Sequence, residues 1–116
     1  MDVLDFLTHL PVFASLGSDA VQALSAELEF QKIPSGSVLF KQGETGEAFY
    51  ILASGKLLAT VNSAGDLKSF SSEVKPGEFV GEMALLTGQP RSASVLAVED
   101  SELLRLGTSA YERLAL

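Results

Sequence analysis

Short apolar runs separated by glycine-containing turns fill the chain from Gln31 to about Leu106. This pattern limits the possible folds to a few β architectures. Eight of the ten glycines lie between positions 36 and 88. Regularly spaced short strands with such turns are typical of antiparallel sandwiches and barrels. We expect strands at residues 38–41, 49–52, 57–61, 67–74, 94–98 and 103–106. The predicted class is α+β, mainly β: an antiparallel jelly-roll β-barrel.

Helices are expected on both sides of this β region. Two sets of apolar residues recur at helical spacing before it: Val3, Phe6, Leu7 and Leu10, then Val21, Leu24 and Leu28. Asp2 can cap the first helix and Pro11 ends it, whereas Ser18 and Asp19 are the predicted cap of the second. A last helix is expected at residues 108–116. The helices should pack outside the barrel.

The segment at residues 81–94, GEMALLTGQPRSAS, contains only two formal charges, Glu82 and Arg91. A guanidinium matches two phosphate oxygens with its fixed fork of donors. An ionised carboxylate only accepts hydrogen bonds, which suits a ribose hydroxyl. One acid and one base among small and apolar residues therefore predict a pocket for a small ligand with hydroxyls and one anionic group. A structural ion pair between the two side chains is the alternative.

The charge of the chain limits its partners. The formal net charge is −7, and the eight basic residues are scattered. Nucleic-acid binding depends on clustered Lys and Arg, so we expect no direct nucleic-acid binding. No apolar run approaches the roughly 18 residues of a membrane span, so no membrane segment is expected. Asp2 and Asp5 stand where a secretory leader would have Lys or Arg, which favours a cytoplasmic location.

The chemistry of the remaining residues predicts neither a metal site nor an enzyme. The chain has one histidine, His9, and no cysteine, so a metal centre lacks its usual ligands. No nucleophile–base pair is evident. His9 is expected at the surface. Arg105 and Arg113 are expected to be solvated or paired with Glu102 and Glu112.

Two stretches resemble the cyclic nucleotide-binding domain shared by catabolite activator proteins, protein kinase A regulatory subunits and cyclic nucleotide-gated channels. GETGEAFYILASG, at residues 43–55, is similar to the first signature of that family. PGEFVGEMALLTGQPRSASV, at residues 76–95, is similar to its phosphate-binding cassette. The resemblance implies one domain over residues 1–116, divided as follows: N-terminal helices at about 2–29, a β-roll at about 31–106 with the cassette at 81–94, and the start of a C-terminal helix at 108–116.

The resemblance also implies a role for each matching residue. Glu82 would accept a hydrogen bond from the ribose 2′-hydroxyl, and Arg91 would bind the exocyclic oxygens of a cyclic phosphate. Backbone N–H groups of Ala84 and Ser92 would add donors, and Gly81 would allow close approach. The implied ligand contacts are Gly81, Glu82, Met83, Ala84, Arg91, Ser92 and Ala93.

The implied function is a regulatory sensor, not an enzyme, that binds a cyclic nucleotide and no other cofactor. It would transmit occupancy to an effector domain in the same or a partner chain. Guanine-preferring members tend to have Thr after the cassette arginine, so Ser92 favours cAMP over cGMP. Val80 departs from the aromatic residue that the family often has there, and the lid helix is missing from the sequence. A degenerate domain that serves as a structural or docking module is the alternative.

Overall fold

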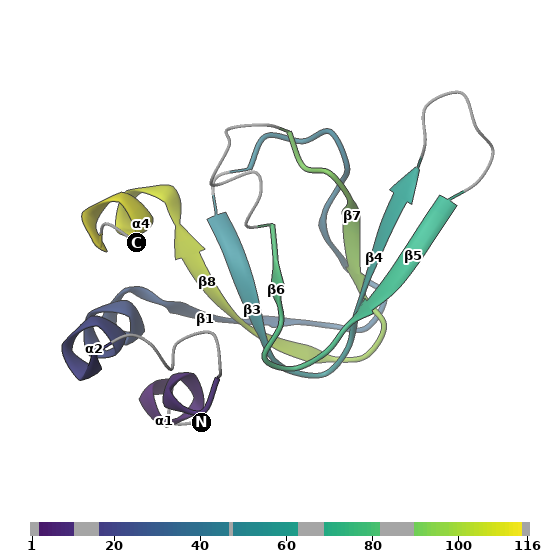
Figure 1. Cartoon of the computed structure of the whole chain (residues 1–116). Coiled ribbons are helices and arrows are strands. Elements are labelled where there is room, and N and C mark those ends of the chain that lie inside the picture. The colour runs from purple at the N-terminus through teal and green to yellow at the C-terminus, as the bar shows by residue number, and fades with distance from the viewer. Residues whose placement is uncertain (1–2, 11–16, 47, 63–68, 82–89, 115–116) are drawn as a thin grey trace.

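A computed structural model describes residues 3–10, 17–46, 48–62, 69–81 and 90–114 of the chain (Figure 1). Its helices are α1 (Val3–Thr8), α2 (Ser18–Glu27) and α4 (Thr108–Leu114). Its strands are β1 (Glu29–Ile33), β2 (Val38–Phe40), β3 (Ala48–Ser54), β4 (Leu57–Asn62), β5 (Ser69–Val74), β6 (Phe79–Val80), β7 (Ser94–Ala97) and β8 (Ser101–Gly107). Within these residues, no helix is long and apolar enough to cross a membrane.

The strands form two four-stranded sheets, ordered β1-β8-β3-β6 and β2-β7-β4-β5. Every pairing is antiparallel, and most neighbours are distant in sequence, as when β3 pairs with β8. Two antiparallel sheets whose strands are joined by connections that cross from one sheet to the other form a jelly roll. The predicted fold class is therefore confirmed.

Alternating side chains of β3 and β8 divide the core into two clusters. On β3, Phe49 and Ile51 face the helices, whereas Leu52 faces the other sheet. On β8, Leu104 faces the helices and Leu103 faces the other sheet. This sheet is covered on both faces, because side chains of successive strand residues point in opposite directions.

The three described helices lie together on the outer side of the β1-β8-β3-β6 sheet (Figure 1). Leu7 of α1 and Leu24 of α2 are fully buried against this sheet, and Ala110 of α4 joins the same cluster. The predicted apolar faces of the N-terminal helices are thus confirmed at these positions. The expected capping by Asp2 and the stop at Pro11 lie outside the described residues.

Three local predictions were wrong. Gly17 occupies the N-cap position of α2, so Ser18 and Asp19 are helical residues and not the cap. The helix ends at Glu27, and residues 29–33 form strand β1, which was not expected. Strand β1 escaped notice because four of its five residues are exposed, so it lacks an apolar alternation. The two-residue strand β6 was also missed.

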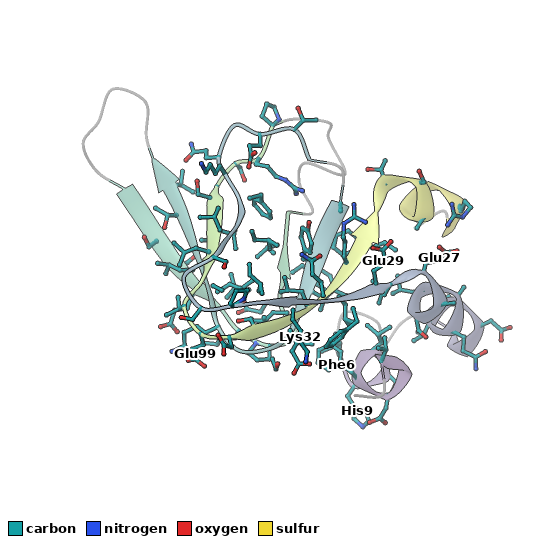
Figure 2. The ribbon with its side chains drawn as sticks, turned by 180° about the vertical axis from the view of Figure 1, so that it is seen from behind. Phe6, His9, Glu27, Glu29, Lys32 and Glu99 are labelled. Atoms are coloured by element: carbon teal, nitrogen blue, oxygen red, sulfur yellow. The ribbon has the colours of Figure 1, made fainter. Side chains whose placement is uncertain are left out.

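Arg113 is exposed, as one of the two predicted alternatives has it, but Arg105 and Arg113 also form ion pairs with partners that were not expected. Arg113 Nη2 of α4 lies 2.6 Å from Glu27 Oε2 of α2, and Arg105 Nη1 lies 3.6 Å from Glu29 Oε2. Figure 2 shows Glu27 and Glu29 where α2 passes into β1. These contacts depend on strand and helix neighbours that sequence spacing does not reveal. His9 is exposed at the outer side of α1, as predicted (Figure 2).

Candidate ligand-binding site

A cavity of about 250 Å³ opens between the two sheets. Its apolar wall includes Phe40 of β2, Val95 of β7 and Val80 of β6, so both sheets contribute. Ligand pockets of proteins usually measure roughly 300–1,000 Å³, so the volume enclosed by the described residues lies just below that range.

Arg91 is fixed at one end of the cavity by its backbone. Its N–H donates to the carbonyl of Glu44 at 2.7 Å, and its own carbonyl accepts from the N–H of Gly43 at 2.8 Å. The N–H of Gln42 also donates to Oγ of Ser94, at 2.9 Å. The glycine turn of the first family-like stretch therefore anchors the arginine of the second.

The guanidinium of Arg91 is buried but only partly satisfied. The residue is 6% exposed, and Nη1 donates to the carbonyl of Gly81 at 3.1 Å. Its Nε is buried without a hydrogen-bond partner among the described residues. The centre of the guanidinium lies 4.1 Å from the ring centroid of Phe40. In the part of the chain that the structure describes, no carboxylate forms an ion pair with it.

Burial lowers the pKa of Arg91 because it removes water from the charged form. Tyr50 and Glu44 oppose this effect and raise the pKa, whereas Arg105 lowers it further. Arginine stays protonated despite such shifts. The result is a desolvated cation at the end of a cavity, with at least one donor available for an anion.

Gly81 lies directly against this cation. Its φ is +84°, in the left-handed region that favours glycine, and a Cβ there would overlap Nη1 of Arg91. The absence of a side chain thus lets the carbonyl of Gly81 reach the guanidinium. The predicted close approach of Gly81 to a ligand remains a prediction.

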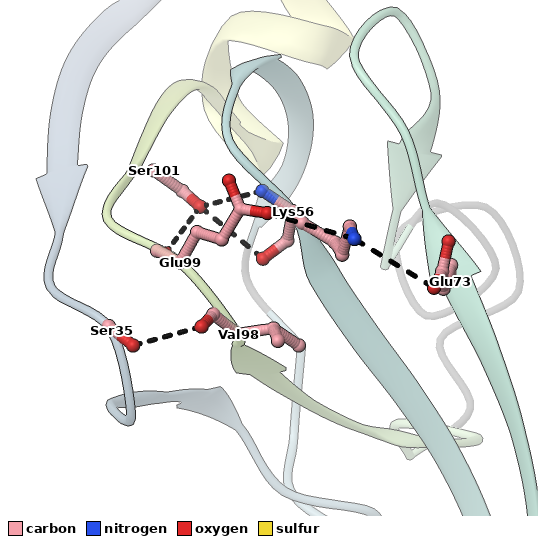
Figure 3. A network of polar contacts seen from close by, with 6 residues as sticks. All are labelled: Ser35, Lys56, Glu73, Val98, Glu99 and Ser101. Atoms are coloured by element: carbon pink, nitrogen blue, oxygen red, sulfur yellow. Dashed lines mark hydrogen bonds and ion pairs between the residues drawn. The ribbon is translucent and has the colours of Figure 1, made fainter.

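Two carboxylates also line the cavity. Ser72 and Glu73 of β5 line it together with Glu78, which precedes β6. Lys56 Nζ lies 4.0 Å from Glu73 and 3.7 Å from Glu99 (Figure 3). Glu73 and Glu78 are both exposed, so their carboxylates add hydrogen-bond acceptors to the lining for N–H or O–H groups of a ligand.

The structure brings together four of the predicted site residues: Gly81, Arg91, Ser92 and Ala93 all line the cavity. Glu82, Met83 and Ala84 lie outside the described residues, so their predicted contacts remain predictions. Phe40 was missed, because a strand phenylalanine in an apolar run has the pattern of an ordinary core residue. Neither the apolar run that contains Phe40 nor its distance from Arg91 in the sequence indicates that the two side chains are in contact.

This arrangement can bind a small ligand. The described residues contain no group of three or more side chains that could hold a metal ion. The buried cation favours an anionic group, and the two carboxylates favour hydroxyl or amine donors. A small molecule that carries a phosphate together with N–H or O–H donors satisfies both.

The chain is similar to a family of known proteins. The family model described as the cyclic nucleotide-binding domain matches residues 30–116. The chain is 37% identical over 110 residues to a cAMP-dependent protein kinase regulatory subunit of Colletotrichum orbiculare. That match covers 95% of this chain and 27% of the relative. The chain therefore spans about a quarter of that regulatory subunit.

Solved structures agree with the fold. The catabolite activator protein of Thermus thermophilus superposes with a TM-score of 0.80 at 39% identity, covering 90% of this chain and 49% of that one. The regulatory domain of Toxoplasma gondii PKA, solved with cAMP, superposes with a TM-score of 0.91. That match covers 97% of this chain and 44% of the other, and at 24% identity it supports the fold alone.

Proposed function

Because this chain belongs to the cyclic nucleotide-binding domain family, we propose that it is a regulatory sensor module that binds cAMP and transmits occupancy to an effector. The effector is a domain of the same or a partner chain. The chain itself performs no catalysis. The relatives are a regulatory subunit of a cAMP-dependent protein kinase and a catabolite activator protein, which is consistent with a regulatory role.

The observation on which this proposal rests is the buried guanidinium of Arg91. A desolvated cation without an ion pair among the described residues is costly unless an anion compensates it. The phosphate of a cyclic nucleotide supplies one negative charge and two exocyclic oxygens, which a guanidinium can bind with two parallel hydrogen bonds. Ser92, which lines the same end of the cavity, adds a hydroxyl donor.

The preference for cAMP over cGMP rests on Ser92 alone. The carboxylates of Glu73 and Glu78 do not distinguish the two bases, because adenine and guanine both present N–H donors. A serine at position 92 follows the pattern of cAMP-selective family members rather than that of guanine-preferring ones. The proposal is therefore cAMP first, with cGMP as the competing ligand.

Transmission is proposed to run through the C-terminal helix. Strand β8 continues into α4 without a break at Gly107 and Thr108, and α4 packs against the helix-side core through Ala110. Ligand binding would change how apolar cassette residues, among them Met83, pack against this helix. A ligand shifts such an equilibrium only by its difference in affinity for the two states.

A thermal-unfolding experiment tests the binding proposal. A ligand that binds only the folded state raises the melting temperature, by an amount that grows with its concentration over Kd. We expect cAMP to raise it most, cGMP less, and 5′-AMP least, because the last has a doubly charged, uncyclised phosphate. No shift with any cyclic nucleotide at millimolar concentration would favour a structural or docking module with an unused pocket.

A further inference from the structure

The side chain of Phe40 packs its ring against the guanidinium of Arg91, with 4.1 Å between the guanidinium carbon and the ring centroid. We propose that Phe40 is a positioning residue: its ring holds the guanidinium of Arg91 in place at the anion-binding end of the cavity. The contribution to ligand affinity rests on the proposed function. The contribution to the position of Arg91 does not.

The guanidinium of Arg91, against which the ring of Phe40 packs, has few hydrogen-bond partners. Arg91 is 6% exposed, and its Nε has no hydrogen-bond partner among the described residues. A cation over the face of an aromatic ring within about 6 Å is attracted by the ring quadrupole, and the attraction grows when water is excluded. The ring of Phe40 therefore replaces part of the lost hydration without occupying an N–H donor.

Phe40 is itself held firmly enough to act as a support. It is 9% exposed, and it pairs with Val95 where β2 meets β7. Its ring also stacks on that of Tyr50, with 6.2 Å between the centroids and an angle of 28° between the planes. The ring of Phe40 that supports the guanidinium is thus part of the core between the two sheets.

Two contacts of different kinds define where the guanidinium lies. The carbonyl of Gly81 accepts from Nη1, and the ring of Phe40 packs against the group. A single hydrogen bond leaves a guanidinium free to rotate about that bond, whereas a ring packed against the group restricts this rotation. Nε is buried and has no hydrogen-bond partner among the described residues, so the ring contact takes the place of a second hydrogen bond in fixing the group.

Replacement of the ring separates positioning from packing. Phe40→Leu keeps an apolar side chain and removes the aromatic face, and Phe40→Tyr restores the face. Phe49→Leu is the matched control: Phe49 is 7% exposed, but it belongs to the helix-side cluster and packs on Phe79 instead of Arg91. A merely structural role would make Phe40→Leu and Phe49→Leu behave alike.

The first measurement uses the ligand-free protein. The Nε–H signal of Arg91 in nitrogen–proton NMR spectra is assigned by its loss in Arg91→Lys. We expect a ring-current shift and slow exchange with water in the parent, in Phe40→Tyr and in Phe49→Leu. In Phe40→Leu the shift should vanish and exchange should be roughly tenfold faster, as expected for a loss of about 1.4 kcal/mol of protection. An unchanged signal in Phe40→Leu, or an equal change in Phe49→Leu, would overturn the positioning role.

The second measurement is calorimetric titration with cAMP. We expect Phe40→Leu to weaken binding roughly tenfold, Phe40→Tyr to recover most of that loss, and Phe49→Leu to change affinity less than about threefold. Equal affinity of the parent and Phe40→Leu would overturn the contribution to ligand binding. Absence of binding in the parent would instead contradict the proposed function, and the NMR comparison would still decide whether Phe40 positions Arg91.

Discussion

Nη1 of Arg91 donates to the carbonyl of Gly81 at 3.1 Å and occupies the space that a Cβ on Gly81 would need. Gly81, which precedes the predicted carboxylate Glu82, is thus in direct contact with Arg91, although the two residues are ten positions apart in the sequence. Any side chain at position 81 must displace the guanidinium.

Gly81→Ala should therefore weaken cAMP binding more than it weakens the fold. Its positive φ of +84° costs a non-glycine residue about 1–2 kcal/mol of unfolding free energy. The overlap with Nη1 moves Arg91 in addition, and we expect at least a tenfold loss of affinity, or about 1.4 kcal/mol. Chemical denaturation and calorimetric titration measure the two effects.

Gly36→Ala is the matched control for this substitution. Gly36 has a φ of +88°, but no atom lies within 4 Å of the position of its Cβ. It should lose a similar amount of stability while the folded protein keeps its affinity for cAMP. Equal losses of affinity in the two variants would show that backbone strain, and not the displacement of Arg91, accounts for the effect.

Glu82 is expected to read the ribose 2′-hydroxyl, as the family resemblance implies. A hydrogen bond to a charged group contributes about 1.5–3 kcal/mol, so the parent should bind cAMP at least about tenfold more tightly than 2′-deoxy-cAMP. Glu82→Ala should bind both ligands with nearly equal affinity. Competition binding with the two nucleotides measures this ratio.

An acidic residue away from the cavity provides the control for Glu82→Ala. Glu99→Ala removes one negative charge from the network around Lys56, and it should keep the preference of the parent for the 2′-hydroxyl (Figure 3). If Glu82→Ala also keeps that preference, the carboxylate does not read the sugar.

The ion pair between Arg113 and Glu27 should contribute little to stability. Arg113 has a side chain that is 60% exposed, and exposed pairs contribute about 0–1 kcal/mol. We expect Arg113→Ala to lower the free energy of unfolding by less than 1 kcal/mol, with a smaller effect at high salt. Urea denaturation at two salt concentrations, with Glu27→Gln and the double variant, measures the coupling between them.

A loss well above 1 kcal/mol in Arg113→Ala would contradict this expectation. It would mean that α4 depends on the pair for its contact with α2, rather than on the burial of Ala110 in the helix-side cluster. The same variant should bind cAMP with an affinity close to that of the parent, because Arg113 does not line the cavity.

Patterns of neighbouring residues explain which parts of the fold the sequence predicts. Strand β3 was placed correctly because its apolar run, with Ile51 and Leu52 buried on opposite faces, is bounded by turn residues. Strand β1 was missed because only Ile33 of its five residues is buried. Its existence depends on pairing with β8, which is about 70 residues distant and leaves no local pattern.

The same distinction applies to the site. Arg91 was predicted because a lone cation among small residues is conspicuous in sequence. Its supports were not predicted, since the turn at Gly43 and Glu44 and the ring of Phe40 reach it only through the three-dimensional fold. The sequence therefore indicates which residues are chemically active, whereas the residues that hold them in place are identified only from the structure.

The central claim is that the buried guanidinium of Arg91 binds a cyclic phosphate, and calorimetric titration of cAMP into the parent, Arg91→Ala and Arg91→Lys tests it most directly. Removal of one partner of a buried charged hydrogen bond costs roughly 2–5 kcal/mol, so Arg91→Ala should bind at least about 30-fold more weakly. Arg91→Lys should fall between them, since it keeps the charge without the fork. Arg113→Ala, which removes the same charge from the surface, should bind like the parent. An affinity of Arg91→Ala equal to that of the parent would contradict the account.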